Sequence, residues 1–536
     1  MNLKLKIASL TQPTNGAGCT RPTKNAKHFI DAITPRKQTM KKILPTFFPI
    51  SFALITLPAT ADTAQQNRQT TSNYYSALVK QQRLSELSML MNMMPKGGDI
   101  HHHYTGSIYA EHYLDWVAQQ GYCIYRESDP SQKQEKFRIE TRAQFINDTN
   151  KSCIKVDAVR QDNSFYRALL ATWSMLDYEH HLSPQVAPDQ HFFNTFGYFS
   201  PISKFNTNQG LKQLKERAKA ENQQYLETML KSAPITDHPQ LSANIDALRS
   251  DSKKETLYAA FKEFADFLAQ DAAAQKKISD YVQEITNDTA GLDDADFQLK
   301  LQSYASRNSA PSKVFSSLFA AFSASQDHPL IVGVNILGPE NGIVALRDYD
   351  LHMQMLAYLK QRFPRVRLAL HAGELRLGLV PPEQLQNHIR NAVTIAGAQR
   401  IGHGVDIMHE AQPDQLLKDM KQGDVAVEIN LSSNAIILGI EQQAHPVLVY
   451  LRNAVPIVIS SDDMGVSRSK LSHEYLLFAS RYQPSYDTLK KTVYNSIRYS
   501  FLNAADKAKQ LRQLDQRFLA FEATTAQVAK REARRF

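Results

Sequence analysis

The sequence predicts a TIM (β/α)8 barrel, an α/β fold of alternating strands and helices, on three observations. Five short apolar runs have the length and composition of buried strands: 331–337, 367–371, 400–403, 425–431 and 457–462. Roughly 30 residues separate one run from the next, enough for a strand and a returning helix. Polar residues follow several of these runs, at the strand ends where such barrels carry their active sites.

Helices are predicted between the strands. One begins at Pro381-Pro382-Glu383 and ends near Gly397, and Pro413 and Pro446 mark two further helix starts. The apolar positions of the first share helical spacing: Leu385, Ile389, Ala392, Val393 and Ala396. A doubly wound open sheet is the alternative fold, and it would place the chemistry at one switch point rather than at many strand ends.

Four short strings carry chemistry, in this order: His101-His102-His103, His371-Ala372-Gly373-Glu374, Ile401-Gly402-His403-Gly404 and Ser461-Asp462-Asp463. Alternate side chains of a strand share a face, so His101 and His103 can bind one ion while His102 points away. Alone, each string has an ordinary explanation, such as a polar strand end, a core histidine or a helix N-cap. Their joint occurrence in barrel order favours metal-assisted hydrolysis.

The ordered motifs resemble those of the adenosine deaminases, a family of the amidohydrolase superfamily of metal-dependent barrels. The resemblance covers about residues 94–505 and includes MPKGGDIH at 94–101, GVNILGPE at 333–340 and EINLSSN at 428–434. It is strongest to the secreted, growth-factor type of the family. It implies zinc-dependent hydrolytic deamination of adenosine, and of 2′-deoxyadenosine, to inosine and ammonia, with a small purine nucleoside as the binding partner.

The resemblance also implies roles for individual residues. One zinc ion per chain would be bound by His101, His103, His371 and Asp462. Glu374 would give a proton to purine N1, and His403 would hold and deprotonate the attacking water. Asp463 would contact purine N7, and the backbone N–H of Gly338 would contact N3.

Three positions depart from the family pattern, one of them in Glu428-Ile-Asn-Leu-Ser-Ser, which lacks the family's frequent proline. Thr105 stands where many single-domain members have an acidic residue that contacts the ribose. Its hydroxyl can still hydrogen-bond a sugar, so we expect Thr105 to bind substrate. Asn335 stands where other members have an aspartate before the turn glycine, which we interpret as a variation near the pocket.

The N-terminal region predicts export. Met40-Lys41-Lys42, the apolar stretch 43–57 and Ala59-Thr60-Ala61 are typical of a secretory signal peptide over 40–61, with cleavage after Ala61. The apolar stretch is too short and too interrupted by proline for a stable membrane anchor. We expect a periplasmic or extracellular protein whose translation starts at Met40, which makes residues 1–39 an untranslated or unstructured upstream extension.

The mature chain is expected to consist of a helical segment, 62–93, and a deaminase barrel, 94–536. The formal charge of +9 arises mainly from residues 1–61, whose nine Lys and Arg and one Asp give +8. The remaining +1 indicates no basic surface for nucleic acid. By resemblance to the secreted type, the segment 62–93 implies a homodimer.

An insertion is expected after the first barrel strand, over about residues 119–163, which look irregular and polar. It contains Cys123 and Cys153, which could pair in an oxidising compartment or be two unrelated thiols. The resemblance to the secreted type, which carries a disulfide-bearing insertion here, implies that they pair.

The stretch between residues 104 and 330 is the least informative. We predict charged amphipathic helices over 211–231 and 255–285, and a solvated loop or helix end over 287–297. Two barrel strands must lie in this stretch, but no pattern places them. Two other functions remain open: an amidohydrolase acting on adenine or a modified adenine nucleoside, and a binding or growth-factor-like barrel without catalysis.

Overall fold

The computed structural model describes residues 61–534, except for 130–133, 147–152 and 179–185. The predicted upstream extension, 1–39, and the signal peptide, 40–61, lie outside the described residues apart from Ala61. The division of the mature chain at residue 94 stays a prediction.

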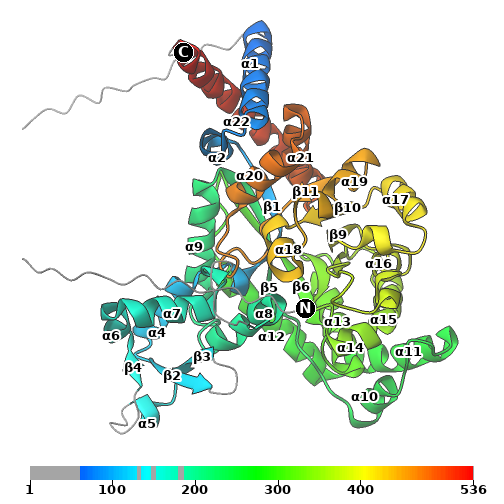
Figure 1. Ribbon diagram of the computed structural model, residues 1–536. Coiled ribbons are helices and arrows are strands. Elements are labelled where there is room, and N and C mark those ends of the chain that lie inside the picture. The colour runs from blue at the N-terminus through cyan, green and yellow to red at the C-terminus, as the bar shows by residue number, and fades with distance from the viewer. Residues whose placement is uncertain (1–60, 130–133, 147–152, 179–185, 535–536) are drawn as a thin grey trace, which may run out of the picture. The chain divides into compact units, whose positions relative to one another are not determined.

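Two parallel four-stranded sheets, drawn from the described residues, form one barrel (Figure 1). The first has the order β1-β5-β6-β7, with bounds Gly97–His103, Gln223–Ser232, Gln298–Ser306 and Ile331–Leu337. The second has the order β11-β10-β9-β8, with bounds Ile457–Ile459, Ala426–Ile429, Arg400–His403 and Ala369–Ala372.

Two seams join these sheets. At the first, Val334 pairs with Leu368, and its N–H donates to the carbonyl of Arg367 at 2.9 Å. At the second, which we call the closing seam, His102 pairs with Asp462 just after β11. The predicted barrel is therefore confirmed, and the open-sheet alternative is wrong.

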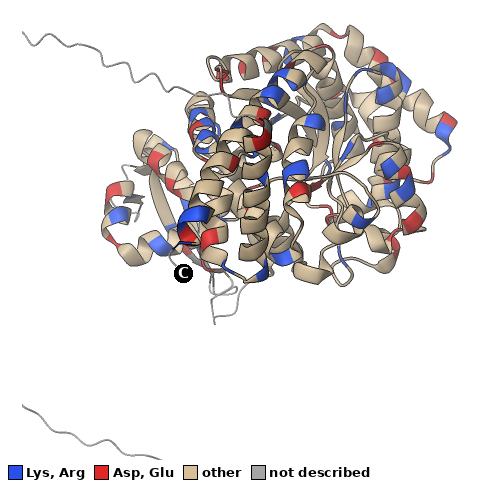
Figure 2. Ribbon diagram, turned by 90° about the horizontal axis from the view of Figure 1, so that it is seen from above, with Lys and Arg blue, Asp and Glu red and all other residues tan. Residues whose placement is uncertain are grey.

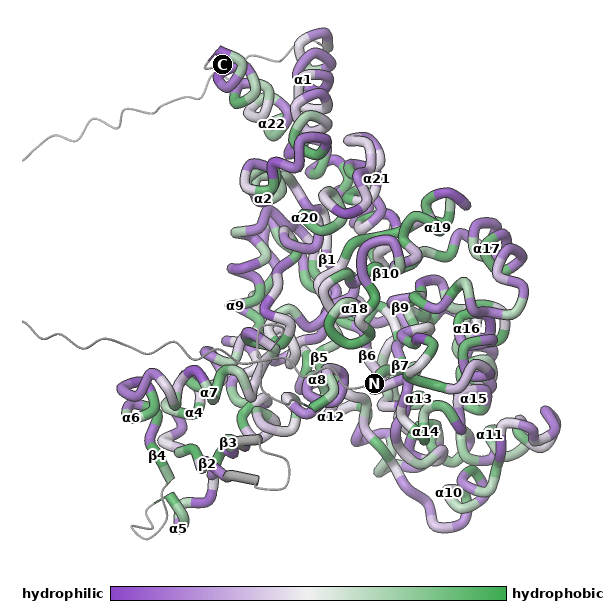
Figure 3. The backbone as a smooth tube through the Cα atoms, in the orientation of Figure 1, coloured by the Kyte–Doolittle hydropathy of each residue, from purple (hydrophilic) through white to green (hydrophobic). Residues whose placement is uncertain are grey.

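Helices follow the strands along the chain and bury their apolar positions against them. From β6 onward these are α13 (Pro311–Ser325), α14 (Ile343–Arg347), α15 (Tyr349–Arg362), α16 (His388–Thr394), α17 (Pro413–Gln422), α18 (Leu431–Leu438), α19 (Val447–Arg452), α20 (Leu471–Tyr482) and α21 (Tyr486–Arg498). Figure 3 shows α13 and α18 largely green, as expected for helices packed on the barrel.

The predicted helix starts are confirmed at Pro413, where α17 begins, and at Pro446, which caps α19. The helix predicted from Pro381 is instead a 3-10 turn, Pro382–Leu385, followed by α16. Gly397 has a φ of +74°, a left-handed backbone that ends the segment as predicted.

The two unplaced strands are β5 and β6. The prediction of a helix over 211–231 is wrong beyond Ala220, where α9 (Thr207–Ala220) ends and the chain enters β5. Both strands bury polar side chains, such as Glu227 and Gln302, that find partners across the barrel. Because the sequence does not reveal these partners, the polar residues of β5 and β6 look exposed and the two strands do not show an apolar pattern.

The remaining helices before β6 also differ in detail from the predictions. The helix predicted over 255–285 is two helices, α11 (Lys254–Gln270) and α12 (Ala272–Asp288). They separate at Asp271, whose carboxylate accepts from the N–H of Ala274 and caps α12. The other helices here are α3 (Tyr104–Ser107), α4 (Ala110–Gln119), α7 (Asn163–Trp173), α8 (Pro188–Phe199) and α10 (Pro239–Asp246).

The insertion is more regular than its sequence indicates. It contains a three-stranded antiparallel sheet with the order β3-β2-β4, whose strands are Gln134–Glu140, Cys123–Asp129 and Ile154–Lys155. Two short helices accompany it, α5 (Ala143–Ile146) and α6 (Val156–Gln161). A disulfide joins Cys123 to Cys153, with 5.5 Å between their Cα atoms.

The segment 62–93 forms α1 (Ala61–Lys80) and α2 (Leu84–Met93). Figure 1 shows α1 beside α22 (Ala504–Glu532), and the Tyr74 hydroxyl donates to Glu532 at 2.7 Å. Figure 2 shows Lys and Arg interspersed with Asp and Glu over the helices. None of the helices in the described part of the chain is both long and apolar enough to span a bilayer.

Candidate active site

Three histidines and one aspartate converge at the carboxyl end of the barrel. They come from three places: His101 and His103 lie on β1, His371 lies on β8, and Asp462 lies on the closing seam. Their ligand atoms all lie within 4.8 Å of one another. His103 Nε2 is 3.1 Å from His371 Nε2, and Asp462 Oδ1 is 3.2 Å from His103 Nε2.

The chemistry of this His/Asp cluster fits a divalent metal ion. His101 Nε2 and Asp462 Oδ1 are buried, lie 3.3 Å from each other, and have no hydrogen-bond partner outside the cluster among the described residues. Buried polar atoms without partners are costly unless a ligand satisfies them. Imidazole nitrogens and a carboxylate oxygen form a donor set that such ions accept.

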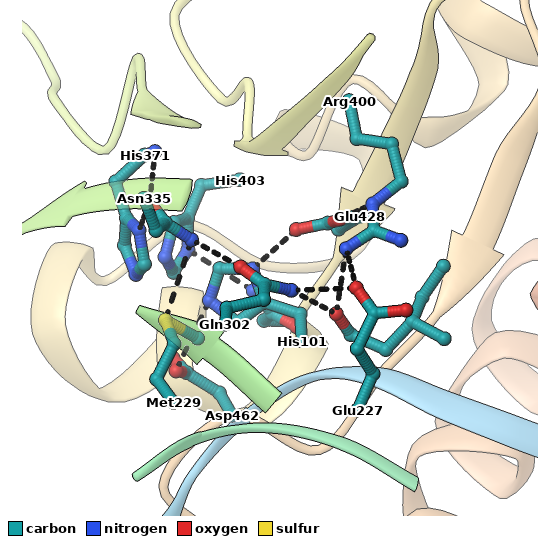
Figure 4. A network of polar contacts seen from close by, with 12 residues as sticks. His101, Glu227, Met229, Gln302, Asn335, His371, Arg400, His403, Glu428 and Asp462 are labelled. Atoms are coloured by element: carbon teal, nitrogen blue, oxygen red, sulfur yellow. Dashed lines mark hydrogen bonds and ion pairs between the residues drawn. The ribbon is translucent and has the colours of Figure 1, made fainter. Parts of the chain in front are cut away.

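Buried polar residues orient the histidines of the cluster (Figure 4). The Nδ1–H of His101 donates to Glu428 at 2.6 Å, and Arg400 Nε lies 2.5 Å from the other oxygen of Glu428. The Nδ1–H of His371 donates to Asn335 Oδ1 at 2.9 Å. These contacts fix the tautomer in which each Nε2 is free to face an ion.

Sequence reasoning missed Glu428 and Arg400 as partners of the cluster and treated Asn335 only as a departure. The available signal was a charged residue at the start of a predicted strand or within one, because Arg400 begins β9 and Glu428 lies inside β10. Glu227 Oε1 completes the chain of charges, 2.5 Å from Arg400 Nη2. Such burial of an arginine requires paired carboxylates.

Glu374 lies just beyond β8, with its Oε1 3.5 Å from His403 Nδ1. Burial raises the pKa of Glu374 well above its usual value, and the charges of Asp462 and Glu340 raise it further. The side chain therefore favours the protonated form, as a proton donor near neutral pH requires.

Two amide side chains hold His403: those of Asn434 and, more distantly, Asn430, whose Nδ2 lies 3.4 Å from His403 Nδ1. The Nδ2 group of Asn434 donates to His403 Nδ1 at 2.9 Å, while Asn434 Oδ1 accepts from His445 at 3.1 Å. This arrangement makes Nδ1 an acceptor and assigns the ring hydrogen to Nε2. Burial lowers the pKa of His403 to about 3, so the ring is neutral.

Two of these residues occupy an unfavourable backbone region. His403 has a φ of +70° and Asp462 has a φ of +55°. Non-glycine residues rarely adopt such values, and they concentrate at functional sites where surrounding structure holds them. The turns aim both side chains across the end of the barrel.

A cavity of about 310 Å³ opens on the cluster. It is lined by these predicted site residues: His103, Thr105, Gly338, His371, Glu374, His403, Asp462 and Asp463. The remaining predicted residue, His101, lies in the cluster itself. The structure thus brings together all the residues that the sequence predicted for metal, substrate and catalysis.

Aromatic and apolar side chains complete the lining. Phe192, Phe193 and Phe196 come from α8, and Tyr304 and Met229 come from the ends of β6 and β5. The sequence alone assigned these phenylalanines no role. His191, in the same helix, donates to the carbonyls of Ala171 and Ser174 and so ties α8 to α7.

Comparison with known proteins gives one family match. The adenosine deaminase family model matches residues 246–517, which contain Gly338, His371, Glu374, His403 and Asp462. His101, His103 and Thr105 precede the matched stretch, and the fold brings them to the same site.

Named relatives and one solved structure agree with this match. An adenosine deaminase from Haemophilus ducreyi is 29% identical over 189 residues, which cover 35% of this chain and 50% of that protein. One from Aedes albopictus is 32% identical over 148 residues, 26% of each chain. The aligned stretches thus span half or less of these relatives.

The Arabidopsis N6-mAMP deaminase MAPDA shares the fold, with a TM-score of 0.50 at 16% identity, over 80% of this chain and 99% of that one. Because the family model matches half of the sequence, the chain belongs to the adenosine deaminase family.

Proposed function

We propose that the protein is a zinc-dependent adenosine deaminase that converts adenosine and 2′-deoxyadenosine to inosine and ammonia. The observation that carries the proposal is the position of Glu374, a buried acid beside the His/Asp cluster in a cavity of about 310 Å³. A cavity of this size and mixed lining suits one small ligand.

Zinc would be held by His101, His103, His371 and Asp462, one ion per chain. When bound, it would supply Lewis-acid activation of a water at near-neutral pH. Glu428 and Asn335 support the proposal because they leave the Nε2 atoms of His101 and His371 for the ion.

The residues of the chain provide the proton and orientation. Glu374 would donate its proton to purine N1, which makes C6 electrophilic to the water. His403 would hold that water and take its proton, and the lone pair that can accept a proton is at Nδ1. Attack at C6 then gives a tetrahedral species; the proton taken from the water passes to the 6-amino group, which leaves as ammonia.

Substrate contacts would come from Gly338, Asp463 and Thr105, all of which line the cavity. Gly338 has a φ of +109°, a conformation that suits glycine and presents its N–H toward purine N3. Purine N7 is an acceptor, so Asp463 must donate to it. Burial raises the pKa of Asp463 to about 8, which keeps the side chain protonated near neutral pH, and its Oδ1 has no hydrogen-bond partner among the described residues. Thr105 would bind the ribose.

The cavity favours a nucleoside or free base over a nucleotide. Its described lining contains neither Lys nor Arg, the residues that usually bind a phosphate. The adenine or modified-nucleoside alternative thus remains a second candidate. A non-catalytic scaffold is disfavoured, because a binding barrel has no use for a protonated acid beside the cluster.

We also propose that the protein is exported and resembles the secreted, growth-factor type. The predicted signal peptide and the Cys123–Cys153 disulfide support export. N-terminal sequencing of exported protein should begin at Asp62; retention of residues 1–39 would contradict the proposed start. Homodimerisation through the segment 62–93 is tested by sedimentation of the chain with and without that segment.

The central test follows the ultraviolet absorbance of adenosine, deoxyadenosine, adenine and AMP with the purified protein and with Glu374→Gln. The substitution keeps the shape but cannot deliver the proton, so turnover of adenosine should fall by about 10²–10⁴-fold. Bound zinc should stay, since Glu374 is not a proposed ligand. A parent protein that binds adenosine but never releases ammonia would establish the scaffold alternative.

A further inference from the structure

Glu340 is a buried carboxylate whose charge raises the pKa of Glu374 and whose hydrogen bonds have not yet been described. It follows β7 and is 2% exposed. Its Oε2 accepts from the backbone N–H of Glu374 at 2.9 Å, and its Oε1 accepts from the N–H of Gly373 at 3.1 Å. Both contacts are with the segment that carries the proposed acid.

This segment needs an external partner. β8 ends at Ala372, so the next two N–H groups have no neighbouring strand to bind. Gly373 has a φ of +74°, and a Cβ there would lie 2.4 Å from Asp406 Oδ1. The chain therefore makes a tight turn here, and Glu340 is its hydrogen-bond acceptor.

The carboxylate of Glu340 is itself fixed. His388 Nδ1 donates to Oε1 at 2.6 Å. Tyr349 stacks on His388, with ring centroids 3.6 Å apart and planes inclined by 4°, and its hydroxyl donates to the His388 carbonyl at 2.8 Å. Rotation of Glu340 would break several of these contacts together.

Arg307 holds the same segment from the other side. Its Nη2 donates to the carbonyl of His371 at 2.6 Å and to that of Ile336 at 3.1 Å. Its Nη1 lies 3.6 Å from Glu340 Oε2. Residues 371–374 are thus held by two buried charged side chains. Arg307 donates to the carbonyl of His371, and Glu340 accepts from the N–H groups of Gly373 and Glu374.

We propose that Glu340 is a positioning residue, which aims Glu374 at the substrate by accepting from two consecutive backbone N–H groups. The proposal rests on the proposed function, because it takes Glu374 to be the proton donor. Glu340 touches neither the substrate nor the His/Asp cluster in this scheme. The positioning role requires that both side-chain oxygens of residue 340 accept hydrogen bonds.

Glu340→Gln tests this requirement with little change in size. The amide has one acceptor and one donor, so an NH2 group must face either a backbone N–H or the donor of His388. A displacement of the Glu374 carboxyl group by about 1 Å would lower the rate by about 10²-fold. We expect kcat to fall about 10- to 100-fold, KM to change less than about 3-fold, and zinc content to stay at the parent value.

Glu410→Gln is the matched control. Glu410 is also buried, and its Oε1 accepts from the N–H groups of Ile389 and Arg390, but it does not contact residues 371–374. Its Oε2 has no hydrogen-bond partner among the described residues, so a glutamine can keep the acceptor in place. This variant should retain the parent kcat.

A double-mutant cycle separates positioning from general damage. In the Glu374→Gln background, Glu340→Gln should change turnover by less than about 3-fold, because it acts through a proton that is already absent. A full, additive loss would overturn the proposal. If Glu340→Gln does not fold, the cycle is run with Glu340→Asp, which keeps two acceptor oxygens and should lose less kcat than an alanine variant.

A crystal structure of the variant gives a readout that does not depend on activity. Residues 373–374 should move relative to the parent while His371 stays in place. An unmoved segment would overturn the positioning role even in an inactive protein. Absence of deamination by the parent would instead refute the proposed function, so the two failures are distinguishable.

Discussion

Gly106 lies against the side chain of Asp463, and replacing it with alanine should displace that carboxylate. A Cβ at position 106 would lie 1.6 Å from Asp463 Oδ1, 2.4 Å from its Cγ and 2.7 Å from its Cβ. Ordinary contact begins near 3.4 Å, so Oδ1 must move by about 1.8 Å, the difference between the two distances. Rotation of the carboxylate alone does not relieve the contact with Cγ and Cβ.

The expected cost follows from the proposed hydrogen bond between Asp463 and purine N7. Because N7 is an acceptor, the donor is protonated Asp463, and a hydrogen bond between neutral groups contributes about 0.5–1.5 kcal/mol, which corresponds to about 2- to 13-fold in kcat/KM. The neighbouring Asp462, a proposed metal ligand, is held by its own backbone bonds to β1. Zinc content should therefore remain at the parent value.

The assay compares steady-state deamination of adenosine and zinc stoichiometry in parent, Gly106→Ala and Gly197→Ala. Gly197 lies in α8, and a Cβ there would meet nothing within 4 Å, so it controls for the added methyl group. A Gly106→Ala protein that is folded, loaded with zinc and as active as the parent would refute the assignment of Asp463 to the substrate.

Three further outcomes are expected. Glu428→Gln should weaken zinc affinity about 10- to 100-fold through His101, measured by competition with a chelating dye; unchanged affinity would show that Glu428 does not orient the ligand. Loss of the Cys123–Cys153 bond, which links residues 30 positions apart, should lower the free energy of unfolding by about 3–4 kcal/mol on the chain-entropy model. Melts of parent and Cys153→Ser check this, and equal stability would contradict it. Burial raises the pKa of Glu410 to about 7, so the parent loses stability as this group ionises between about pH 4.5 and 7. The free energy of unfolding of Glu410→Gln, relative to that of the parent, should therefore be up to about 3 kcal/mol higher at pH 8 than at pH 4. A difference in stability that does not change with pH would argue against a raised pKa.

The residues of the site could be predicted because each lies in a short motif at the end of an apolar run. His101 and His103 share a strand face, His371 is the residue before the last of β8, and His403 ends β9. Residues that hold them could not be predicted in this way. Glu428 contacts His101 across 327 positions of sequence, and no local pattern encodes such a pairing.

The fold shows the same division between local and distant information. Apolar strands such as β7 and β11 are visible from composition alone. Strand β5 is not, because Glu227 looks like a surface residue until Arg400 is placed beside it. The helical prediction over 211–231 failed at that point, where tertiary pairing outweighs local propensity.

The closing seam makes the metal site depend on the two ends of the barrel sequence. The N–H of Asp462 donates to the carbonyl of His101 at 3.0 Å, and the N–H of His103 donates to the carbonyl of Asp462 at 3.2 Å. The proposed set of metal ligands therefore cannot be complete during refolding until β1 pairs with the segment that follows β11. His101 and Asp462 are 361 positions apart in the sequence. Contacts of such sequence separation form slowly. An ion that binds only the closed barrel stabilises the closed barrel by mass action. Zinc should therefore slow the opening of the closing seam more than the opening of the Val334–Leu368 seam. Hydrogen exchange of the backbone amides of His103 and Val334 measures the two openings.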